Sequence, residues 1–554
     1  MVRIPPNIFS RHSYPTATGV ELSADDQDGF PLTSGQSQHY RMTKENPELR
    51  TAIWSSYRIP GALDVGRFVD GVETLVAGHE ALRTEIFERP DGELRQRIVD
   101  PPDRSRLITC EQVLSRSEDQ FDRYVRHLVA SEQTKEWEAG APPFRFRLLR
   151  YAPEVHAFVA GFSHTAVDGV GSEILMRDLM RIHRETMRGS RPSGPPRGRF
   201  VESALREAAA LEKRARRVRK HDFSGVPPVT QFRTGSPGPR KAAGPSSRKS
   251  DFSLTGEELA ALRRAADRHG CTEFHWILAA FATTVFRVTR QDRLKVSIPV
   301  NLRGPADRDV VGMYVVAVPV VIDRPTGPDD LRRYPRKVGT AVLRATAMYR
   351  TGSPELLDRA LTEQSERWGA RCRHDLTVNY RKVSGMSRRS FTRLERDEHR
   401  ARVDYSFPGV GLRIFSFEDA LDVQAVLDSG LFPGDTAGDL VAALREDLTS
   451  PDHWARSGAR DLPGESVELR DAGGATVVSA DPAKVAEALL RHPLVRTASV
   501  FRETGGAGGT RLRAEVGVRE GLTEDSLRDH LLSLGAHASG VLAPGRISVS
   551  SSPS

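Results

Sequence analysis

The sequence predicts an α/β fold of the α+β type, because helical and strand-like segments alternate along most of the 554 residues. Residues 64–87 repeat apolar side chains at the spacing of one helix face. Residues 156–163, HAFVAGFS, are typical of a buried strand. Residues 172–187 follow as a second amphipathic helix, for which Ser172 is the expected N-cap.

This alternation falls into three blocks, which we predict to be separate units. A basic stretch rich in proline, glycine and serine separates the first two and is typical of a flexible linker. Its positive run can alternatively serve as a landing patch for an acidic protein partner. The predicted boundaries are 1–27 for an N-terminal extension, 28–205 for a first lobe, 206–250 for the linker, 251–450 for a second lobe and 463–554 for a small C-terminal α+β domain.

The composition favours a protein with packed cores. Hydrophobic residues make up 38% of the chain and charged residues 28%, and no segment approaches the roughly 20 apolar residues of a membrane helix. The N-terminus lacks the pattern of a secretory signal, and the 3 cysteines show no disulfide framework or metal-ligand spacing. We therefore expect a cytoplasmic protein without a bound metal or a membrane partner. The net charge of +8 is mixed with acidic residues, so we expect no nucleic-acid partner.

The stretch FSHTAVDGVG at 162–171 carries the candidate chemistry. A hydrolase triad is disfavoured, because Ser163 and His164 are adjacent and would point to opposite faces of a strand. A histidine at the end of a buried strand can instead accept a proton from an amine or hydroxyl near neutral pH. Asp168 then either orients His164 or fixes the turn, and Gly169 allows close approach of a substrate to the backbone. The alternative is a core histidine satisfied by hydrogen bonds.

The segment SHTAVDG resembles the HHxxxDG signature of nonribosomal peptide synthetase condensation domains, within the chloramphenicol-acetyltransferase-like acyltransferase superfamily. Further resemblances follow in the order of that family, over roughly residues 28–450. They are PLTSGQSQ at 31–38, GHEALRTEIF at 78–87, APPFRFRLLR at 141–150, SIPVNLRG at 297–304, VGMYVVAVPV at 311–320, DLTVNY at 375–380 and LDSGLFPGDTAGDLVAALREDL at 427–448.

The resemblance implies two chloramphenicol-acetyltransferase-like lobes in a V-shaped pseudo-dimer. It implies that His164 is the catalytic histidine, which deprotonates or holds the acceptor amine, and that the backbone of Gly169 lies close to the reacting thioester. Asp168 and Arg303 are expected to form a structural ion pair at the site. Ser163 stands where the family has its first histidine, a position that shapes the site.

The implied activity is that of a condensation-type acyltransferase. It joins a carrier-protein-bound acyl or aminoacyl thioester to an acceptor amine in nonribosomal peptide or related secondary-metabolite biosynthesis. No cofactor is expected to be bound, because carrier proteins present the substrates as 4'-phosphopantetheine thioesters, and the acceptor is a small molecule or is itself carrier-bound.

Two alternatives stay open, an ester-forming acyltransferase with an alcohol acceptor and a catalytically silent module that recruits carriers. The PVNLR sequence at 299–303 resembles acyltransferases that form esters, and Ser163 together with the fragmentary C-terminal block favours the silent module. The family's HQDYPFE motif has no good counterpart and its YxDYxxW motif only a faint one, which indicates a divergent, free-standing member.

The C-terminal block has a resemblance of its own. Residues 481–535 are similar to the small C-terminal subdomain of adenylate-forming enzymes, in which a helix ending in His-Pro leads into strands. The large nucleotide-binding portion and the late catalytic lysine motif are absent, so we expect no adenylation by this chain itself. The predicted role is a remnant that packs as a cap, with docking of a carrier or an adenylation partner as the alternative.

Overall fold

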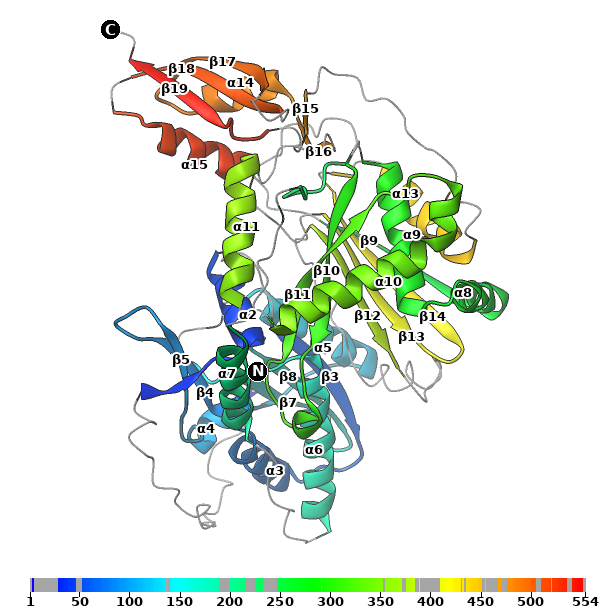
Figure 1. Ribbon diagram of the computed structural model, residues 1–554. Helices are drawn as coiled ribbons and strands as arrows, with labels where there is room; N and C mark the ends of the chain where they lie inside the picture. The colour runs from blue at the N-terminus through cyan, green and yellow to red at the C-terminus, as the bar shows by residue number, and fades with distance from the viewer. Residues whose placement is uncertain are drawn as a thin grey trace. The chain divides into compact units, whose positions relative to one another are not determined.

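The computed structural model shows a chain of mixed helices and sheets that divides into two compact units (Figure 1). The first unit comprises Met1–Arg216 and Val300–Val316, together with a segment outside the described residues. The second comprises Arg217–Pro299, Ala317–Arg388 and Ser406–Ser554. The structure describes residues 2–3, 28–45, 52–135, 137, 140–188, 199–215, 223, 225–232, 247–289, 291–351, 354–370, 375–383, 388, 409–429, 431–432, 435–450, 454, 467–470, 476–504, 510–519, 521–535 and 541–551.

A five-stranded sheet forms the centre of the first unit, in the order β1-β6-β7-β8-β3. Strand β8 pairs antiparallel with both β7 and β3, so it is an interior strand. It corresponds to the strand expected at 156–163, except that Ser163 lies just after its end. The strands are β1 (Val2–Arg3), β6 (Thr109–Gln112), β7 (Phe144–Ala152), β8 (Val155–Phe162) and β3 (Ile53–Pro60).

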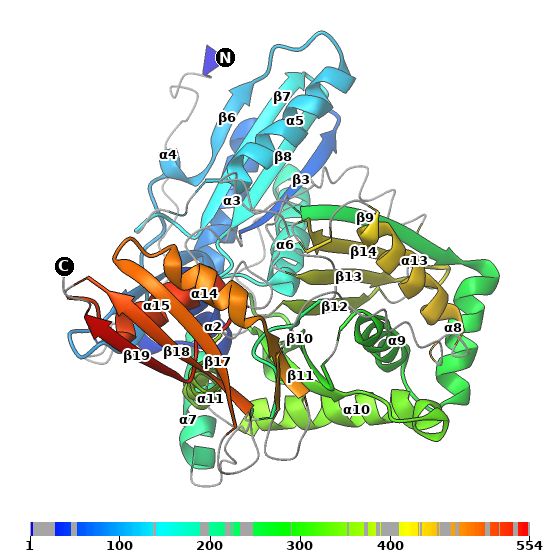
Figure 2. The same cartoon turned by 90° about the horizontal axis from the view of Figure 1, so that it is seen from above.

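Helices cover both faces of this sheet, which explains why β8 is apolar along almost its whole length. Helices α3 (Val65–Gly78) and α6 (Gly169–Met187) pack on the face that carries Phe158. Helix α5 (Glu118–Gln133) packs on the face that carries Val159, and Figure 2 shows it lying along the sheet. The carboxyl end of β8 therefore lies between two packed layers, one of which includes α6.

Smaller elements complete the first unit. A second sheet of three strands has the order β2-β5-β4. The elements are β2 (Phe30–Pro31), α2 (Ser34–Glu45), η2 (Glu80–Arg83), β4 (Thr84–Glu88), β5 (Leu94–Ile98), α4 (Arg104–Leu107) and α7 (Phe200–Ala215).

The second unit is built on a six-stranded sheet in the order β11-β10-β12-β13-β14-β9. Helix α9 is buried on all sides, as expected of a helix that is apolar all round, and it packs against α10 and α13 (Figure 1). The strands are β9 (Ser247–Thr255), β10 (Arg293–Asn301), β11 (Val315–Asp323), β12 (Leu376–Lys382), β13 (Val410–Ser416) and β14 (Ala420–Asp428). The helices are α8 (Gly256–Arg268), α9 (Glu273–Arg287), η3 (Pro305–Asp307, counted with the first unit), α10 (Pro328–Thr351), α11 (Pro354–Trp368) and α13 (Thr436–Thr449).

The C-terminal block is part of the second unit. Its core includes Trp368 and Ala370 at the end of α11, so it shares a hydrophobic cluster with the rest of that unit. The side chain of Gln231 also exchanges hydrogen bonds with the backbone of Ser479, at 2.5 and 2.6 Å. Its elements are β15 (Val467–Arg470), β16 (Thr476–Ala480), α14 (Pro482–Leu490), β17 (Val495–Thr504), β18 (Thr510–Val518), α15 (Glu524–Gly535) and β19 (Arg546–Ser551).

The segment expected to be a linker at 206–250 is partly structured. Helix α7 continues to Ala215, and Phe223, Val226 and Phe232 are buried. Phe232 packs edge-on against Phe432 with ring centroids 4.9 Å apart. This stretch therefore contributes apolar anchors to the second unit, while 216–222, 224 and 233–246 lie outside the described residues.

The expectation that Ser172 caps α6 is wrong. The N-cap is Asp168, whose carboxylate accepts a hydrogen bond from the backbone N–H of Gly171. Ser172 lies within the first turn and donates its hydroxyl to the carbonyl of Gly169 at 2.8 Å. A carboxylate at this position compensates the unpaired N–H groups of the first turn, which a serine one turn later cannot reach.

Candidate active site

A tight turn carries the chain from β8 into α6 and places His164 at its corner. The carbonyl of Ser163 accepts hydrogen bonds from the backbone N–H groups of Ala166 and Val167, at 3.0 and 3.1 Å. The N–H of Ser163 donates to the carbonyl of Pro143 at 3.0 Å. The turn is thus fastened to the chain that precedes β7, and the position of His164 follows from it.

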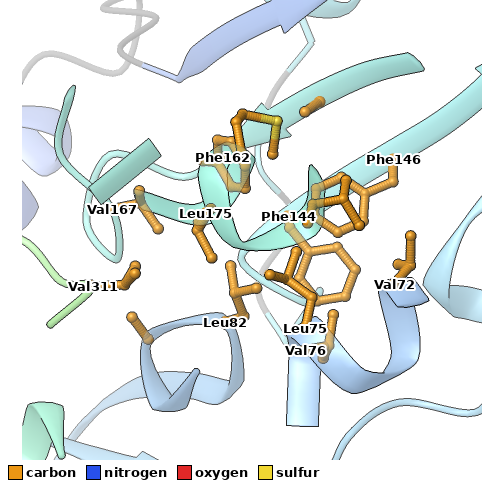
Figure 3. Close-up of a cluster of buried hydrophobic side chains, with 14 of the residues drawn as sticks. Val72, Leu75, Val76, Leu82, Phe144, Phe146, Phe162, Val167, Leu175 and Val311 are labelled. Carbon is orange, nitrogen blue, oxygen red and sulfur yellow. The ribbon is translucent and has the colours of Figure 1, made fainter. Parts of the chain in front are cut away.

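The apolar side of the same turn is buried. Val167 belongs to the hydrophobic cluster that includes Leu175 of α6 and Val311. Figure 3 shows Val167 and Val311 on the same side of this cluster, with Leu82 and Leu175 beside them. Because packed side chains resist displacement, the packing of Val167 in this cluster restrains the turn.

Asp168 ends the turn and binds four donors. Its Oδ1 accepts the N–H of Gly171 at 2.7 Å, and its Oδ2 accepts the N–H of Tyr314 at 3.0 Å. The guanidinium of Arg303 donates to both oxygens, at 2.6 Å to Oδ2 and 2.9 Å to Oδ1. The side chains of Asp168 and Arg303 are 0% and 4% exposed, so the structure brings these two residues into a buried bidentate ion pair.

The remaining donors of Arg303 are also satisfied. They bind the carbonyls of Val310 and Gly312 at 3.3 and 3.1 Å and the side-chain oxygen of Asn301 at 3.5 Å. The guanidinium carbon lies 4.3 Å from the centre of the Tyr314 ring. The ion pair therefore joins the histidine turn to the 303–314 segment of the same unit.

His164 forms part of the wall of a cavity of about 630 Å³. The lining chain comes from α2, from the 82–86 and 99–106 segments, from the end of α5 and from the 163–166 turn. Tyr40 and Trp137 contribute aromatic surface. Five charged residues also line it, namely Arg83, Glu85, Asp100, Arg106 and Lys135. The cavity has the size of a small-molecule site and mixes apolar walls with a few polar groups.

Burial lowers the pKa of His164 below its usual value of 6.5. The carboxylate of Asp168 opposes this shift, and so do nearby backbone groups of His164 and Val167. Nδ1 of His164 is buried and makes no hydrogen bond of normal geometry among the described residues. The imidazole is therefore mainly neutral at pH 7, and its buried Nδ1 is closed to a molecule in the cavity.

Ser163 and Gly169 lie on either side of this histidine turn. The hydroxyl of Ser163 hydrogen-bonds the hydroxyl of Thr165 at 2.8 Å, and both residues line the cavity. Gly169 is exposed as the first residue of α6, with open space where a Cβ would stand. Among the described glycines with positive φ, neither Gly169 nor Gly171 appears, so the glycine at 169 is not explained by backbone strain.

One residue at this site cannot be predicted from the sequence. His39 of α2 is 7% exposed, and its ring centroid lies 4.7 Å from that of His164. It follows directly on the PLTSGQSQ segment, where it reads as an ordinary helical position. Nothing in the local pattern relates it to His164, because only the tertiary structure brings α2 to the turn.

The described residues contain no group of three or more histidine, cysteine, aspartate or glutamate side chains arranged to hold a metal ion. No helix in the described part of the chain is both long and apolar enough to cross a membrane.

Comparisons with known proteins agree on the family. The family model described as Condensation domain matches residues 26–398. Surfactin synthase subunit 1 of Bacillus subtilis is 26% identical over 307 residues, which cover 54% of this chain and 8% of that protein. Phosphinothricin tripeptide synthetase PhsB of Streptomyces viridochromogenes is 28% identical over 345 residues, which cover 59% of this chain and 28% of that protein. The chain thus corresponds to a small part of these curated relatives.

Solved structures share the fold at low sequence identity. The X-domain from teicoplanin biosynthesis superposes with a TM-score of 0.61 at 18% identity, covering 78% of this chain and 97% of that one. The first condensation domain of the calcium-dependent antibiotic synthetase, in complex with a substrate analogue, gives a TM-score of 0.56 at 17% identity, covering 78% of this chain and 97% of that one. The predicted two-lobed α+β class is confirmed.

The fold and the histidine turn define a condensation-type protein. The chain belongs to the condensation-domain family, which forms amide bonds between carrier-bound substrates in nonribosomal peptide synthesis. The C-terminal block at 463–554 lies outside the matched residues, and its likeness to adenylate-forming enzymes stays a prediction.

Proposed function

We propose that this chain is an active acyltransferase that joins a carrier-bound acyl or aminoacyl thioester to an acceptor amine, with His164 as its catalytic residue. The observation that carries the proposal is a neutral imidazole at the wall of a cavity of about 630 Å³. His156 and His183 of the same unit also have a buried Nδ1 without a hydrogen bond of normal geometry, but neither of them lines the cavity, whereas His164 does.

The proposed reaction needs one proton acceptor near the nucleophile. The acceptor nitrogen attacks the thioester carbonyl carbon, so a C–N bond forms and the C–S bond breaks. The proton that leaves the nitrogen passes to Nε2 of His164 and from there to the thiolate of the leaving carrier arm. A base whose pKa lies near or somewhat below neutral is in its free form at working pH, as this role requires.

The ion pair of Asp168 and Arg303 supports the site without touching substrate in this scheme. It fixes the turn, and through the turn it fixes the direction of His164. Correct placement of a base and a nucleophile can supply several kcal/mol of barrier reduction, about 7–11 in favourable cases. We propose that the thioester passes the exposed start of α6 at Gly169, where no side chain intervenes.

The partners of the proposed reaction are acyl or peptidyl carrier proteins, and the acceptor is a small molecule or is carrier-bound. One solved neighbour is a complex of the X-domain with OxyB, so this fold also occurs in a protein–protein complex. That observation, together with Ser163 in place of the first histidine of the motif, favours a carrier-recruiting module as the second candidate. An ester-forming enzyme would use the same His164 with an alcohol in place of the amine.

Mass spectrometry of new acyl products tests the proposal. A panel of carrier-bound acyl thioesters is offered with matched amine and alcohol acceptors to the native protein, to His164→Ala and to His183→Ala. His183 is a suitable control, because it is a partly buried histidine of the same unit that packs edge-on against Phe68, with ring centroids 5.5 Å apart, and does not line the cavity.

Product from the native protein and from His183→Ala, but not from His164→Ala, would support the proposal and name the bond formed. Equal product from all three would remove His164 from the chemistry. Carrier binding without turnover in any of them would favour the recruiting module.

A further inference from the structure

A second imidazole lies against His164 and has no part in the proposed reaction. The ring of His39 is 4.7 Å from the His164 ring between centroids, with the two planes inclined by 35°. This separation lies within the range of aromatic contacts that contribute to stability. His39 comes from α2, far from the histidine turn in sequence, and it is 7% exposed.

Helix α2 is held at its N-terminus by buried hydrogen bonds. The hydroxyl of Thr33 donates to the carbonyl of Met313 at 2.7 Å, and the amide of Gln36 donates to Gln96 at 2.9 Å. A Cβ on Gly35 would lie 2.7 Å from the carbonyl oxygen of Met313. Only glycine therefore allows α2 to approach this segment so closely.

The segment that contains Met313 also hydrogen-bonds the histidine turn. The N–H of Tyr314 donates to Asp168 at 3.0 Å, and the N–H of Asp168 donates to the carbonyl of Gly312 at 3.2 Å. Residues 312–314 thus bind both the start of α2 and the end of the turn. The relative position of His39 and His164 is fixed by one continuous set of hydrogen bonds.

Burial favours the neutral form of both rings, and His164 takes up a proton more readily than His39 does. Burial lowers the pKa of His39 well below 6.5, and the neighbouring His164 lowers it further. Asp168 is the charged side chain that acts on His164 among the described residues, and it raises the pKa of that ring. The first proton therefore belongs to His164, while the ring of His39 stays neutral.

We propose that His39 is a positioning residue for His164. Its neutral ring packs against the His164 ring, sets the direction of the reachable nitrogen toward the cavity and keeps water from the other side of the ring. The proposal rests on the proposed function, because positioning has meaning only if a reaction occurs at His164. A misplacement of about 1 Å can cost about 100-fold in rate, so a contact of this kind has a measurable effect.

Three variants at one position separate a ring contact from simple filling of space. His39→Phe keeps an aromatic ring, His39→Leu keeps apolar volume without a ring, and His39→Ala opens a gap. We expect His39→Phe to keep most of the turnover. We expect His39→Leu to lower kcat by about 10- to 100-fold with little change in KM, because the substrate still binds but His164 is misaligned. His183→Phe and His183→Leu are the matched controls and should not differ from each other in kcat.

A titration gives a readout independent of turnover. The histidine resonances of ¹⁵N-labelled protein are followed by NMR against pH, and His164 is assigned by its loss in His164→Ala. Water admitted by His39→Ala should relieve the burial of His164, so its pKa should move up toward 6.5, and the acid limb of the kcat/KM profile should move with it. In His39→Phe, which stays buried, the pKa should remain low.

Equal kcat in His39→Phe and His39→Leu, or an unchanged His164 titration in His39→Ala, would overturn the inference. If His39→Ala does not fold, the comparison of the other two variants still decides it. If the native protein shows no turnover, the proposed function is contradicted, whatever the His39 variants show. In that case a shifted His164 titration would still support the ring pairing, and an unshifted one would overturn it.

Discussion

Asp168 accepts two hydrogen bonds of 2.6 and 2.9 Å from the guanidinium of Arg303, and its oxygens also accept the N–H groups of Gly171 and Tyr314. One side chain thus caps a helix, pairs with a buried cation and ends the turn that carries His164. Because these three tasks meet in one carboxylate, the ion pair contributes to the position of His164 together with the backbone hydrogen bonds of the turn.

Removing either partner of this ion pair should destabilise the first unit strongly. Arg303→Ala leaves a buried carboxylate with two fewer donors, and the expected loss is about 3–5 kcal/mol of unfolding free energy. Asp168→Asn should cost a similar amount, because Arg303 keeps its charge. Denaturant unfolding of both single variants and of the double variant measures the coupling. Additive losses in the double variant would show that the pair acts as two independent residues.

The two glycines at the start of α6 should respond in opposite ways to alanine. Gly169→Ala enters open space and should keep or slightly raise stability, by about 0.5–1 kcal/mol, since alanine favours the helix. Gly171→Ala brings a Cβ to 3.2 Å from Val167, 3.3 Å from Asp168 and 3.4 Å from the carbonyl of Gly312, so it should destabilise the turn. Thermal melting checks both variants.

Loss of turnover in a stable Gly169→Ala protein would support passage of the thioester over this residue. Normal turnover in that variant would remove Gly169 from the site.

Ser163 should be dispensable for the chemistry. Ser163→Ala removes one hydrogen bond to Thr165 and should cost at most about 0.5–1.5 kcal/mol. Turnover should stay within a few-fold of the native rate, measured beside His164→Ala in the same product assay. A loss as large as that of His164→Ala would reopen the possibility of a serine nucleophile.

Acid should destabilise the protein below about pH 6.5, because several wholly or partly buried histidines favour their neutral form in the folded chain. Burial lowers the pKa of six of the described histidines, namely His39, His156, His164, His183, His275 and His492. Each ring binds a proton more readily in the unfolded chain. Its contribution to stability is therefore complete above the unfolded pKa of 6.5 and is lost as the pH falls through the lower folded pKa.

Unfolding free energies measured between about pH 7.5 and about pH 5.5 should fall toward the acid end. His39→Phe should flatten this slope relative to the native protein. A slope unchanged by that substitution would place the acid sensitivity at the other histidines.

The C-terminal block should depend on Trp368 of α11. Trp368→Ala opens the shared cluster and should cost about 3–5 kcal/mol. Hydrogen exchange should then rise in β17, β18 and β19. An effect confined to α11 would mean that the block folds without this contact.

Much of the fold follows from the sequence because local patterns specify it. Periodicity indicated β8, α3 and α6, since a strand covered on both faces is continuously apolar and a helix on one face repeats every three to four residues. The cap of α6 was assigned to Ser172, because from sequence alone both Asp168 and Ser172 are suitable residue types. The structure selects Asp168, since the carboxylate also meets Arg303 and the amide of Tyr314.

The sequence by itself determined the class of protein and the histidine turn, because both depend on contiguous motifs in a fixed order. Only the tertiary structure decided what surrounds His164. The folded chain brings the ring centroid of His39 in α2 to within 4.7 Å of that of His164, and it forms the cavity beside them. It also packs the C-terminal block against Trp368 in one hydrophobic cluster. These are contacts between segments far apart in the chain, and no local pattern of side chains records which distant segment will pack against it.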